Sequence, residues 1–229
     1  MHPSALTNCK RFFDSYGRFI PSIDAVSVID LGAQNVNGSL REVVPQHFSY
    51  LGVDFVPGDG VDVVLDDPYR LPFESESADV IISSSVFEHS EMFWLVFLEV
   101  MRVLKPTGLF YCNAPSNGLF HRYPVDCWRF YPDAGNALVT WAQRNGMNPV
   151  LLESYTSGQD GDTWNDFVAI YVKDAASAEI YPQRVTSSFR DFTNGTVYGQ
   201  PGFLNFAEAS EDRRKINAIW RIATNNERV

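Results

Sequence analysis

Acidic and small polar residues stand at the ends of four predicted strands in the first half of the chain. Parallel strands end at one edge of an α/β sheet, and ligands bind there. An acid ending the second strand can accept hydrogen bonds from two hydroxyls of a ribose, and one after the third can meet an adenine amino group. Such acids repel a pyrophosphate but suit a ligand with a positive centre and no phosphate. The residues concerned are Asp30, Gly32, Asp54, Asp66, Asp67, Ser84 and Ser85.

The loop after the first strand is poor in glycine. The stretch VIDLGAQNVNGSL runs from Val28 to Leu40 and has glycine only at Gly32 and Gly38. A dinucleotide-binding loop needs more glycines, because its backbone closes on the pyrophosphate at the start of a helix. A ligand without phosphates relaxes that need, so a large polar side chain such as Gln34 is acceptable.

A dense group of polar and aromatic residues follows the fifth predicted strand, in the loop 116–131. Loops on α/β scaffolds often carry function, and we predict that this one binds the substrate. Aromatic rings can stack on a sugar, while an acid and an arginine bind hydroxyls or a carboxylate. The alternative is that the acid and the arginine pair with each other at i,i+3 and that the aromatics form the hinge of a lid. The predicted substrate-binding residues are Tyr123, Asp126, Trp128 and Arg129.

Two histidines are candidates for a general base. His89 is the first choice because imidazole changes charge near neutral pH, and His121 in the loop 116–131 is the second. The alternative for His89 is structural: Glu88 and His89 cap the helix expected from Glu91 and pack locally.

Hydrophobic periodicity predicts alternating strands and helices. Such alternation indicates a doubly wound α/β domain with a mostly parallel sheet flanked by helices. The link 55–60 is too short for a helix, although a parallel crossover usually needs a dozen residues or more. Strands are predicted at 26–31, 48–54, 61–65, 78–83, 107–114, 149–155 and 166–172, and helices at 5–20, 91–104 and 133–145.

Composition limits the partners. The chain has 229 residues and a net charge of −10, with no cluster of lysine and arginine, so a nucleic-acid partner is not expected. No apolar run approaches the length of a membrane span, and the N-terminus lacks the pattern of a signal peptide. Three widely spaced cysteines fit neither a disulfide framework nor a zinc site, which favours the cytoplasm. The acidic loop 159–166 has neither histidine nor the spacing of a calcium loop, so no metal is expected.

The pattern weakens after residue 173. We therefore predict a domain over 1–173, which includes the loop 116–131, and a C-terminal extension over 174–229. A last helix is expected at 207–223, where Ile216, Ile219, Trp220 and Ile222 are apolar. This helix is expected to dock on the domain or on a second copy of the chain, which would make a homodimer.

The stretch from Leu71 to Pro115 resembles the class I S-adenosylmethionine-dependent methyltransferases, in the branch called type 11. The ordered matches are LPF, an acid-bearing fourth strand, Glu88-His89, the run RVLKP from Arg102, and Gly108. With the first loop included, the resemblance covers residues 26–115. It implies a Rossmann-like fold with a seven-stranded sheet and S-adenosyl-L-methionine as the cofactor, with S-adenosyl-L-homocysteine as the product.

The resemblance also assigns roles by position. It places Asp30, Gly32, Ala33 and Gln34 near the methionine end of the cofactor. Asp54 would hold the ribose, Asp66 and Asp67 would flank the adenine, and Ser84 and Ser85 would lie under the sulfonium. Gln34 departs from the family, which usually has glycine there, and its side chain can instead hydrogen-bond the amino-acid part of the cofactor. The loop 117–133 is similar to one in methyltransferases encoded with bacterial surface-polysaccharide genes, which implies a saccharide acceptor.

These observations predict a methyltransferase that acts on a small molecule or a saccharide. One alternative is a nucleotide-sugar oxidoreductase or epimerase that uses a nicotinamide dinucleotide, although the missing glycines count against pyrophosphate binding. The other alternative is a relative with the same fold that binds a ligand or partner without catalysis, as Gln34 and the short link 55–60 would allow.

Overall fold

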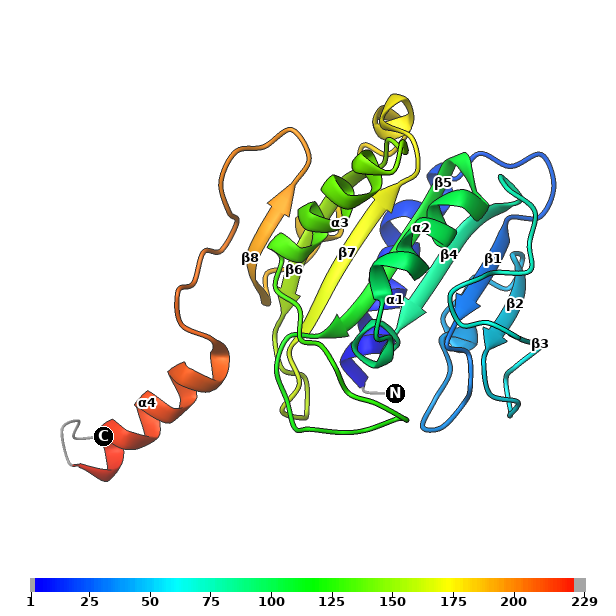
Figure 1. Cartoon of the computed structure of the whole chain (residues 1–229). Helices are drawn as coiled ribbons and strands as arrows, with labels where there is room; N and C mark the ends of the chain where they lie inside the picture. Colours follow the sequence, from blue (N-terminus) through cyan, green and yellow to red (C-terminus); the bar gives the residue numbers. More distant parts are fainter. Residues whose placement is uncertain (1–2, 225–229) are drawn as a thin grey trace.

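A single mixed sheet forms the centre of the protein in the computed structural model, which describes residues 3–224 (Figure 1). Its eight strands lie in the order β3-β2-β1-β4-β5-β7-β6-β8. The strands are β1 (Ser27–Leu31), β2 (Ser49–Asp54), β3 (Val63–Val64), β4 (Ala78–Ser84), β5 (Leu104–Pro115), β6 (Val150–Ser157), β7 (Asp166–Val172) and β8 (Phe192–Val197).

Residues 3–224 also form four α-helices and five short 3-10 helices, of which the first of each kind precedes β1. The helices predicted near residues 5, 91 and 133 all form. The α-helices are α1 (Pro3–Tyr16), α2 (Phe93–Val103), α3 (Asp133–Arg144) and α4 (Glu211–Ala223). The 3-10 helices are η1 (Gly17–Phe19), η2 (Leu40–Glu42), η3 (Phe87–His89), η4 (Ala175–Ile180) and η5 (Val185–Ser187).

Strand direction divides the sheet into two parts. The first five strands pair in parallel, whereas β7, β6 and β8 are each antiparallel to their neighbours. The seven predicted strands are confirmed, and the fold is the expected Rossmann-like α/β architecture. β8 was not predicted, because its sequence FTNGTV contains a glycine and an asparagine in a left-handed conformation, Asn194 at φ 53°.

Helices cover both faces of the sheet, which explains why its central strands are apolar throughout. On one face, Phe12 of α1 packs with Val80 and other core residues. On the other face, Phe97 of α2 packs with Ile81 and Leu138 of α3. Val80 and Ile81 are consecutive in β4, so the alternation of a strand sends them to opposite layers. Figure 1 shows α2 and α3 on the near face and α1 on the far face.

The crossover from β2 to β3 contains no helix, as the sequence indicated. The link packs edge-on against β2: Asp62 accepts a hydrogen bond from the Gly52 amide at 2.7 Å and donates one from its own amide to the Gly52 carbonyl at 2.8 Å. Arg41 also contacts the Asp62 carboxylate at 2.6 Å. These contacts hold the link against β2 in the absence of a crossover helix.

Beyond residue 173 the chain stays attached to the same sheet. The buried Glu153 carboxylate of β6 accepts hydrogen bonds from Tyr16 of α1, from the amides of Val185 and Thr186, and from the Thr186 hydroxyl. β8 then pairs with β6. The division predicted at residue 173 therefore does not coincide with a break in the sheet.

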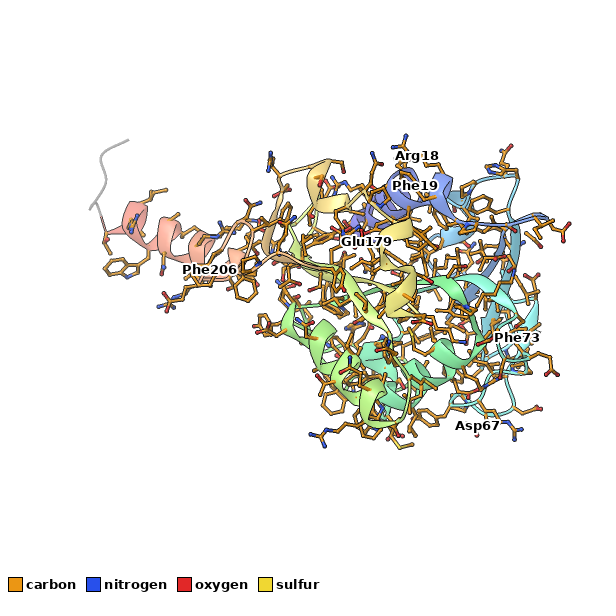
Figure 2. All side chains as sticks on the ribbon, turned by 90° about the horizontal axis from the view of Figure 1, so that it is seen from above. Arg18, Phe19, Asp67, Phe73, Glu179 and Phe206 are labelled. Carbon is orange, nitrogen blue, oxygen red and sulfur yellow. The ribbon has the colours of Figure 1, made fainter. Side chains whose placement is uncertain are left out.

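α4 begins later than predicted and projects away from the domain. Ser210 caps its start by accepting a hydrogen bond from the Arg213 amide at 3.2 Å. No residue of α4 is buried, and the expectation that it docks on its own domain is wrong (Figures 1 and 2). Its first turn is tied to the loop after β6, where Glu211 contacts Gln159 and Asn165. Docking on a second copy stays a prediction.

Membrane spanning is a separate question. Among the helices of residues 3–224, none has both the length and the apolar character needed to cross a bilayer.

The packing of the link against β2 leads to a prediction about Gly52. A Cβ at this position would lie 2.2 Å from the Gly60 carbonyl oxygen and 2.8 Å from the Ala33 Cβ. We expect Gly52→Ala to lower the free energy of unfolding in urea by about 1–3 kcal/mol, the usual cost of overpacking. The matched control is Ser49→Ala, at an exposed position of the same strand. Equal stability of the two variants would show that the link does not pack closely on β2.

Candidate functional site

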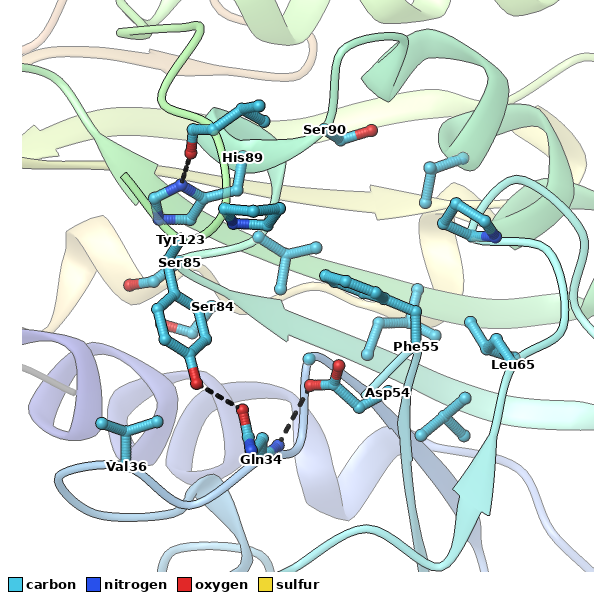
Figure 3. Close-up of a pocket in the computed structure, with 18 of the residues that line it drawn as sticks. Gln34, Val36, Asp54, Phe55, Leu65, Ser84, Ser85, His89, Ser90 and Tyr123 are labelled. Atoms are coloured by element: carbon cyan, nitrogen blue, oxygen red, sulfur yellow. Dashed lines mark hydrogen bonds between the residues drawn. The ribbon is translucent and has the colours of Figure 1, made fainter. Parts of the chain in front are cut away.

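A pocket of about 620 Å³ opens at the carboxyl ends of the parallel strands. Pockets that bind small molecules usually have volumes of about 300–1,000 Å³. Its walls come from the first loop, the segment after β2, the turn after β3, the segment after β4 and the loop 116–131. Figure 3 shows several of the lining side chains, among them Gln34, Asp54, Phe55, Ser84, Ser85, His89 and Tyr123.

Asp54 joins two walls of the pocket. One carboxylate oxygen accepts a hydrogen bond from the Gln34 amide at 3.2 Å, and the other accepts one from the Val56 amide at 3.1 Å. Asp54 is 9% exposed, and Phe55 next to it is exposed on the pocket side. A carboxylate has about four acceptor positions, so Asp54 keeps capacity for further donors.

Gln34 spans from the first loop to the loop 116–131. Its side-chain oxygen accepts a hydrogen bond from the Tyr123 hydroxyl at 2.7 Å (Figure 3). The rest of the Gln34 side chain lies so close to Gly58 that a Cβ on that glycine would be 2.6 Å from the Gln34 nitrogen. The large residue that replaces glycine here therefore has a structural role, because it connects the two sides of the pocket.

Gly32 is required at its position. Its φ is +83°, and a Cβ there would lie 2.1 Å from a methyl carbon of Val86. The segment after β1 thus passes tightly over the segment after β4, which only glycine permits.

Ser84 and Ser85 lie at the end of β4 and line the pocket. Ser84 is buried, and its hydroxyl has no hydrogen-bond partner among the described residues. Ser85 has φ 57°, a left-handed conformation that is uncommon for residues other than glycine. Backbone strain of this kind often occurs at functional sites.

Four of the residues expected to contact a cofactor do not line the pocket. Asp30 is buried toward the α1 side, where it accepts a hydrogen bond from the Tyr50 hydroxyl at 2.5 Å. Ala33 is buried next to Gly52, under the link 55–62. Because β3 is only two residues long, Asp66 and Asp67 lie in an exposed turn rather than at a strand end.

The exposed turn places apolar neighbours of Asp66 and Asp67, and not these acids themselves, in the wall of the pocket. Asp67 accepts a hydrogen bond from the Tyr69 amide at 2.8 Å, and Figure 2 shows its side chain at the edge of the molecule. Leu65, Pro68 and Tyr69 line the pocket in place of the acids.

The histidines predicted as bases both line the pocket. His89 donates its Nδ1 hydrogen to the Val125 carbonyl oxygen, and the rings of His89 and His121 meet edge-on with centroids 4.8 Å apart. Burial lowers the pKa of His89, which favours the neutral imidazole. Beneath them, burial raises the pKa of the Glu88 carboxyl to about 8.

Most of the polar side chains predicted to bind substrate instead brace the loop 116–131. Arg129 makes two hydrogen bonds to the Asp126 carboxylate, at 2.5 and 2.9 Å, and these bonds hold the pKa of Asp126 well below its usual value. Trp128 donates to the Ser90 carbonyl oxygen and packs on Phe93. Neither Asp126, Trp128 nor Arg129 lines the pocket, so the alternative i,i+3 pairing is the observed one. Tyr123 alone of the predicted group does line it.

Several pocket residues were missed by the sequence analysis. Phe55 and Tyr69 are aromatic residues that follow strand ends, and this local signal could have identified them. Trp164 comes from the acidic loop 159–166, to which the sequence analysis gave no binding role, and the centroids of its ring and the His121 ring are 5.0 Å apart. Nothing local in the sequence marks Trp164, because the antiparallel pairing of β5 and β7 brings it to the pocket.

Comparison with known proteins identifies a domain. A family described as "Methyltransferase domain" matches residues 23–112, from just before β1 through most of β5. No protein with a curated description matches the sequence.

Solved structures share the fold at low identity. A putative sarcosine dimethylglycine methyltransferase from Galdieria sulphuraria has a TM-score of 0.53 at 16% identity, covering 73% of this chain and 86% of its own. A Burkholderia thailandensis 1,6-didemethyltoxoflavin N1-methyltransferase, solved with bound 1,6-didemethyltoxoflavin and S-adenosylhomocysteine, has a TM-score of 0.52 at 13% identity, covering 75% of this chain and 79% of its own. The cyclase SpnF reaches 0.50 at 12% identity, covering 72% and 81%. At these identities the likeness shows the fold alone.

The burial of Asp30 predicts a pH dependence of stability. Desolvation raises the pKa of Asp30 in the folded protein to about 7, against 3.8 for the free side chain. The folded state therefore keeps a proton that the unfolded chain releases, so this contribution to stability is complete below about pH 4 and is lost as the pH rises to about 7. We expect Asp30→Asn, which cannot ionise, to gain stability relative to the native protein across that range.

Urea denaturation between pH 4 and 7.5 measures this effect. The control is Asp24→Asn, at an exposed position before β1. A constant difference between Asp30→Asn and the native protein at every pH would show that Asp30 is already ionised in the fold.

Proposed function

The chain carries a methyltransferase domain of the class that uses S-adenosylmethionine, and on that premise we propose that it methylates a small polar molecule or a saccharide. The observation that carries the proposal is the Asp54 carboxylate, which faces a pocket at the strand ends with acceptor capacity to spare. The neighbouring first loop has side chains at positions where a pyrophosphate site needs glycines, whose backbone can approach the phosphates.

The pocket offers a distinct environment for each part of the cofactor. Asp54 suits the two ribose hydroxyls, because a carboxylate accepts from both. Phe55, Leu65 and Tyr69 form an apolar and aromatic wall that suits the adenine. Gly32 and Gln34 lie beside the place for the methionine part, and Ser84 and Ser85 beside that for the sulfonium. Asp30, Ala33, Asp66 and Asp67 do not line the pocket, so this arrangement gives them no contact with the cofactor.

The same features weigh against a nicotinamide dinucleotide. Two phosphates would approach Asp54, whose carboxylate repels them. The segment after β1 continues through Gln34 to the 3-10 helix η2, so it does not present the start of a long helix to an anion.

The acceptor fits best under the loop 116–131. Tyr123, Trp164 and His121 surround this end of the pocket, and aromatic faces of this kind suit a sugar or another flat molecule. A saccharide acceptor would be consistent with a role in surface-polysaccharide synthesis.

Methyl transfer needs alignment and the removal of one proton. When bound, the cofactor would supply an activated methyl group, and an acceptor hydroxyl that takes this methyl would have to give up its proton. Because Nδ1 of His89 carries the hydrogen donated to Val125, its Nε2 has a free lone pair and is placed to accept that proton.

Asp54→Ala tests the cofactor site. We expect the binding free energy of S-adenosylhomocysteine, measured by isothermal titration calorimetry, to weaken by about 1–3 kcal/mol, since a charged hydrogen-bond partner is lost. This loss corresponds to a dissociation constant about 5- to 150-fold higher. Asp24→Ala is the matched control, because Asp24 is an exposed residue before β1 that lies outside the pocket, and this variant should bind as the native protein does. Unchanged affinity in Asp54→Ala would remove Asp54 from the ribose site, and stabilisation by NAD rather than by S-adenosylhomocysteine would contradict the proposed function.

His89→Ala tests the proton acceptor. We expect turnover to fall by about 10²- to 10⁴-fold, the usual contribution of a general base, with little change in S-adenosylhomocysteine affinity. His47→Ala, at an exposed position away from the pocket, should leave both values unchanged. Full activity of His89→Ala would leave His89 with a structural role only.

A further inference from the structure

Three ligating side chains meet at the acceptor end of the pocket. Glu88 and His89 belong to η3, and His121 comes from the loop 116–131. One ligand atom from each lies within 4.8 Å of the others. His121 is far from the Glu88-His89 pair in the chain, so the sequence analysis, which expected no metal, had no spacing pattern to detect this group.

The distances suit a metal ion after a small adjustment. Zinc binds nitrogen and oxygen ligands at about 2.0–2.2 Å, which places neighbouring ligand atoms of a tetrahedral site about 3.4 Å apart. Nε2 of His89 is already 3.7 Å from Oε1 of Glu88. The His121 side chain is 36% exposed and sits in a surface loop, so it has room to approach by the remaining distance.

Both histidines are held as metal-binding histidines usually are. A ligating imidazole typically has its other nitrogen bonded to a carbonyl or carboxylate, which leaves the free nitrogen pointing at the ion. Nδ1 of His89 is bonded to the Val125 carbonyl oxygen. Nδ1 of His121 lies 3.2 Å from the Leu119 carbonyl oxygen and 3.5 Å from a carboxylate oxygen of Asp126. Each ring therefore has Nε2 available for the ion.

Glu88 supplies an independent reason to expect a cation. Its side chain is 1% exposed, and its Oε2 has no hydrogen-bond partner among the described residues. Arg129, the arginine whose charge acts on Glu88, makes its carboxylate hydrogen bonds to Asp126. In the described part of the chain the only ion-pair contact of Glu88 is with His89. A buried carboxyl group with an orphan oxygen is costly, and a bound cation would satisfy it.

We propose that Glu88, His89 and His121 bind one divalent transition-metal ion. Two imidazoles and one carboxylate are a ligand set found for zinc and for other first-row ions. His89 and His121 also line the pocket, so a further coordination position would face the acceptor. This last consequence rests on the proposed function: an acceptor oxygen on the ion would lose its proton more readily, and His89 would then serve as a ligand in place of a base.

Zinc binding to the metal-stripped 229-residue chain tests the site without any cofactor. The background variant is Cys127→Ser, which removes an exposed thiol that would bind zinc by itself. Competition with a chromophoric chelator should give one zinc ion per chain. We expect Glu88→Gln and His121→Ala each to weaken zinc binding at least about 10-fold, since loss even of a supporting contact typically costs 10–100-fold.

Controls separate the site from loss of folding and from surface binding. His47→Ala removes an exposed histidine elsewhere and should leave zinc affinity unchanged. Far-ultraviolet circular dichroism reports folding, and the exposed His121 provides a test should Glu88→Gln fail to fold. Absence of stoichiometric zinc, or equal affinity in the native protein and a folded His121→Ala, overturns the proposed site.

Cofactor binding distinguishes this inference from the proposed function. S-adenosylhomocysteine binding without zinc binding would overturn the proposed metal site and would still support methyl transfer. Zinc binding that depends on His121, with no binding of S-adenosylhomocysteine, would support the metal site and contradict methyl transfer.

Discussion

The arrangement of the pocket depends on the two hydrogen bonds that Asp54 accepts from backbone amides. One amide belongs to Gln34 in the first loop, and the other to Val56 at the start of the tight link. A single carboxylate thus fixes the segment after β1 relative to the segment after β2. The crossover from β2 to β3 has no helix that could do so. Hydrogen bonds to a charged acceptor contribute about 1.5–3 kcal/mol each, enough to hold segments with no regular structure of their own. Because Asp54 retains acceptor capacity, the group that builds the pocket is also the one that we propose binds the ribose.

The pocket has two halves with different chemistry, and one contact joins them. Asp54, Phe55 and the strand ends form the half that suits an adenosyl group without phosphates. His89, His121 and Trp164 form the half that suits an acceptor or a metal ion. The hydrogen bond that Tyr123 donates to Gln34 connects the two halves, so the unusual residue of the first loop links them. The glycine-poor loop is therefore consistent with a working site and does not favour the non-catalytic alternative.

Features set by neighbouring residues could be predicted from the sequence, whereas features set by contacts between distant segments could not. Strands, helices and the ends of β1, β2 and β4 depend on local periodicity, and they were placed to within a few residues. The adenine-side acids were misplaced because β3 is cut to two residues by the link before it, which composition does not reveal. Asp126 and Arg129 have the residue types of a binding pair, but they bond to each other, and only their geometry shows it. Trp164 and the grouping of Glu88 with His121 depend on contacts between distant segments, for which a single sequence contains no signal.

A crystal structure with S-adenosylhomocysteine tests the central claim most directly, namely that the strand ends around Asp54 hold a phosphate-free adenosyl cofactor. The account predicts ribose hydroxyls within hydrogen-bond distance of the Asp54 carboxylate and the sulfur directed toward Ser84, Ser85 and His89. A ligand bound elsewhere, or one whose ribose does not contact Asp54, would contradict it.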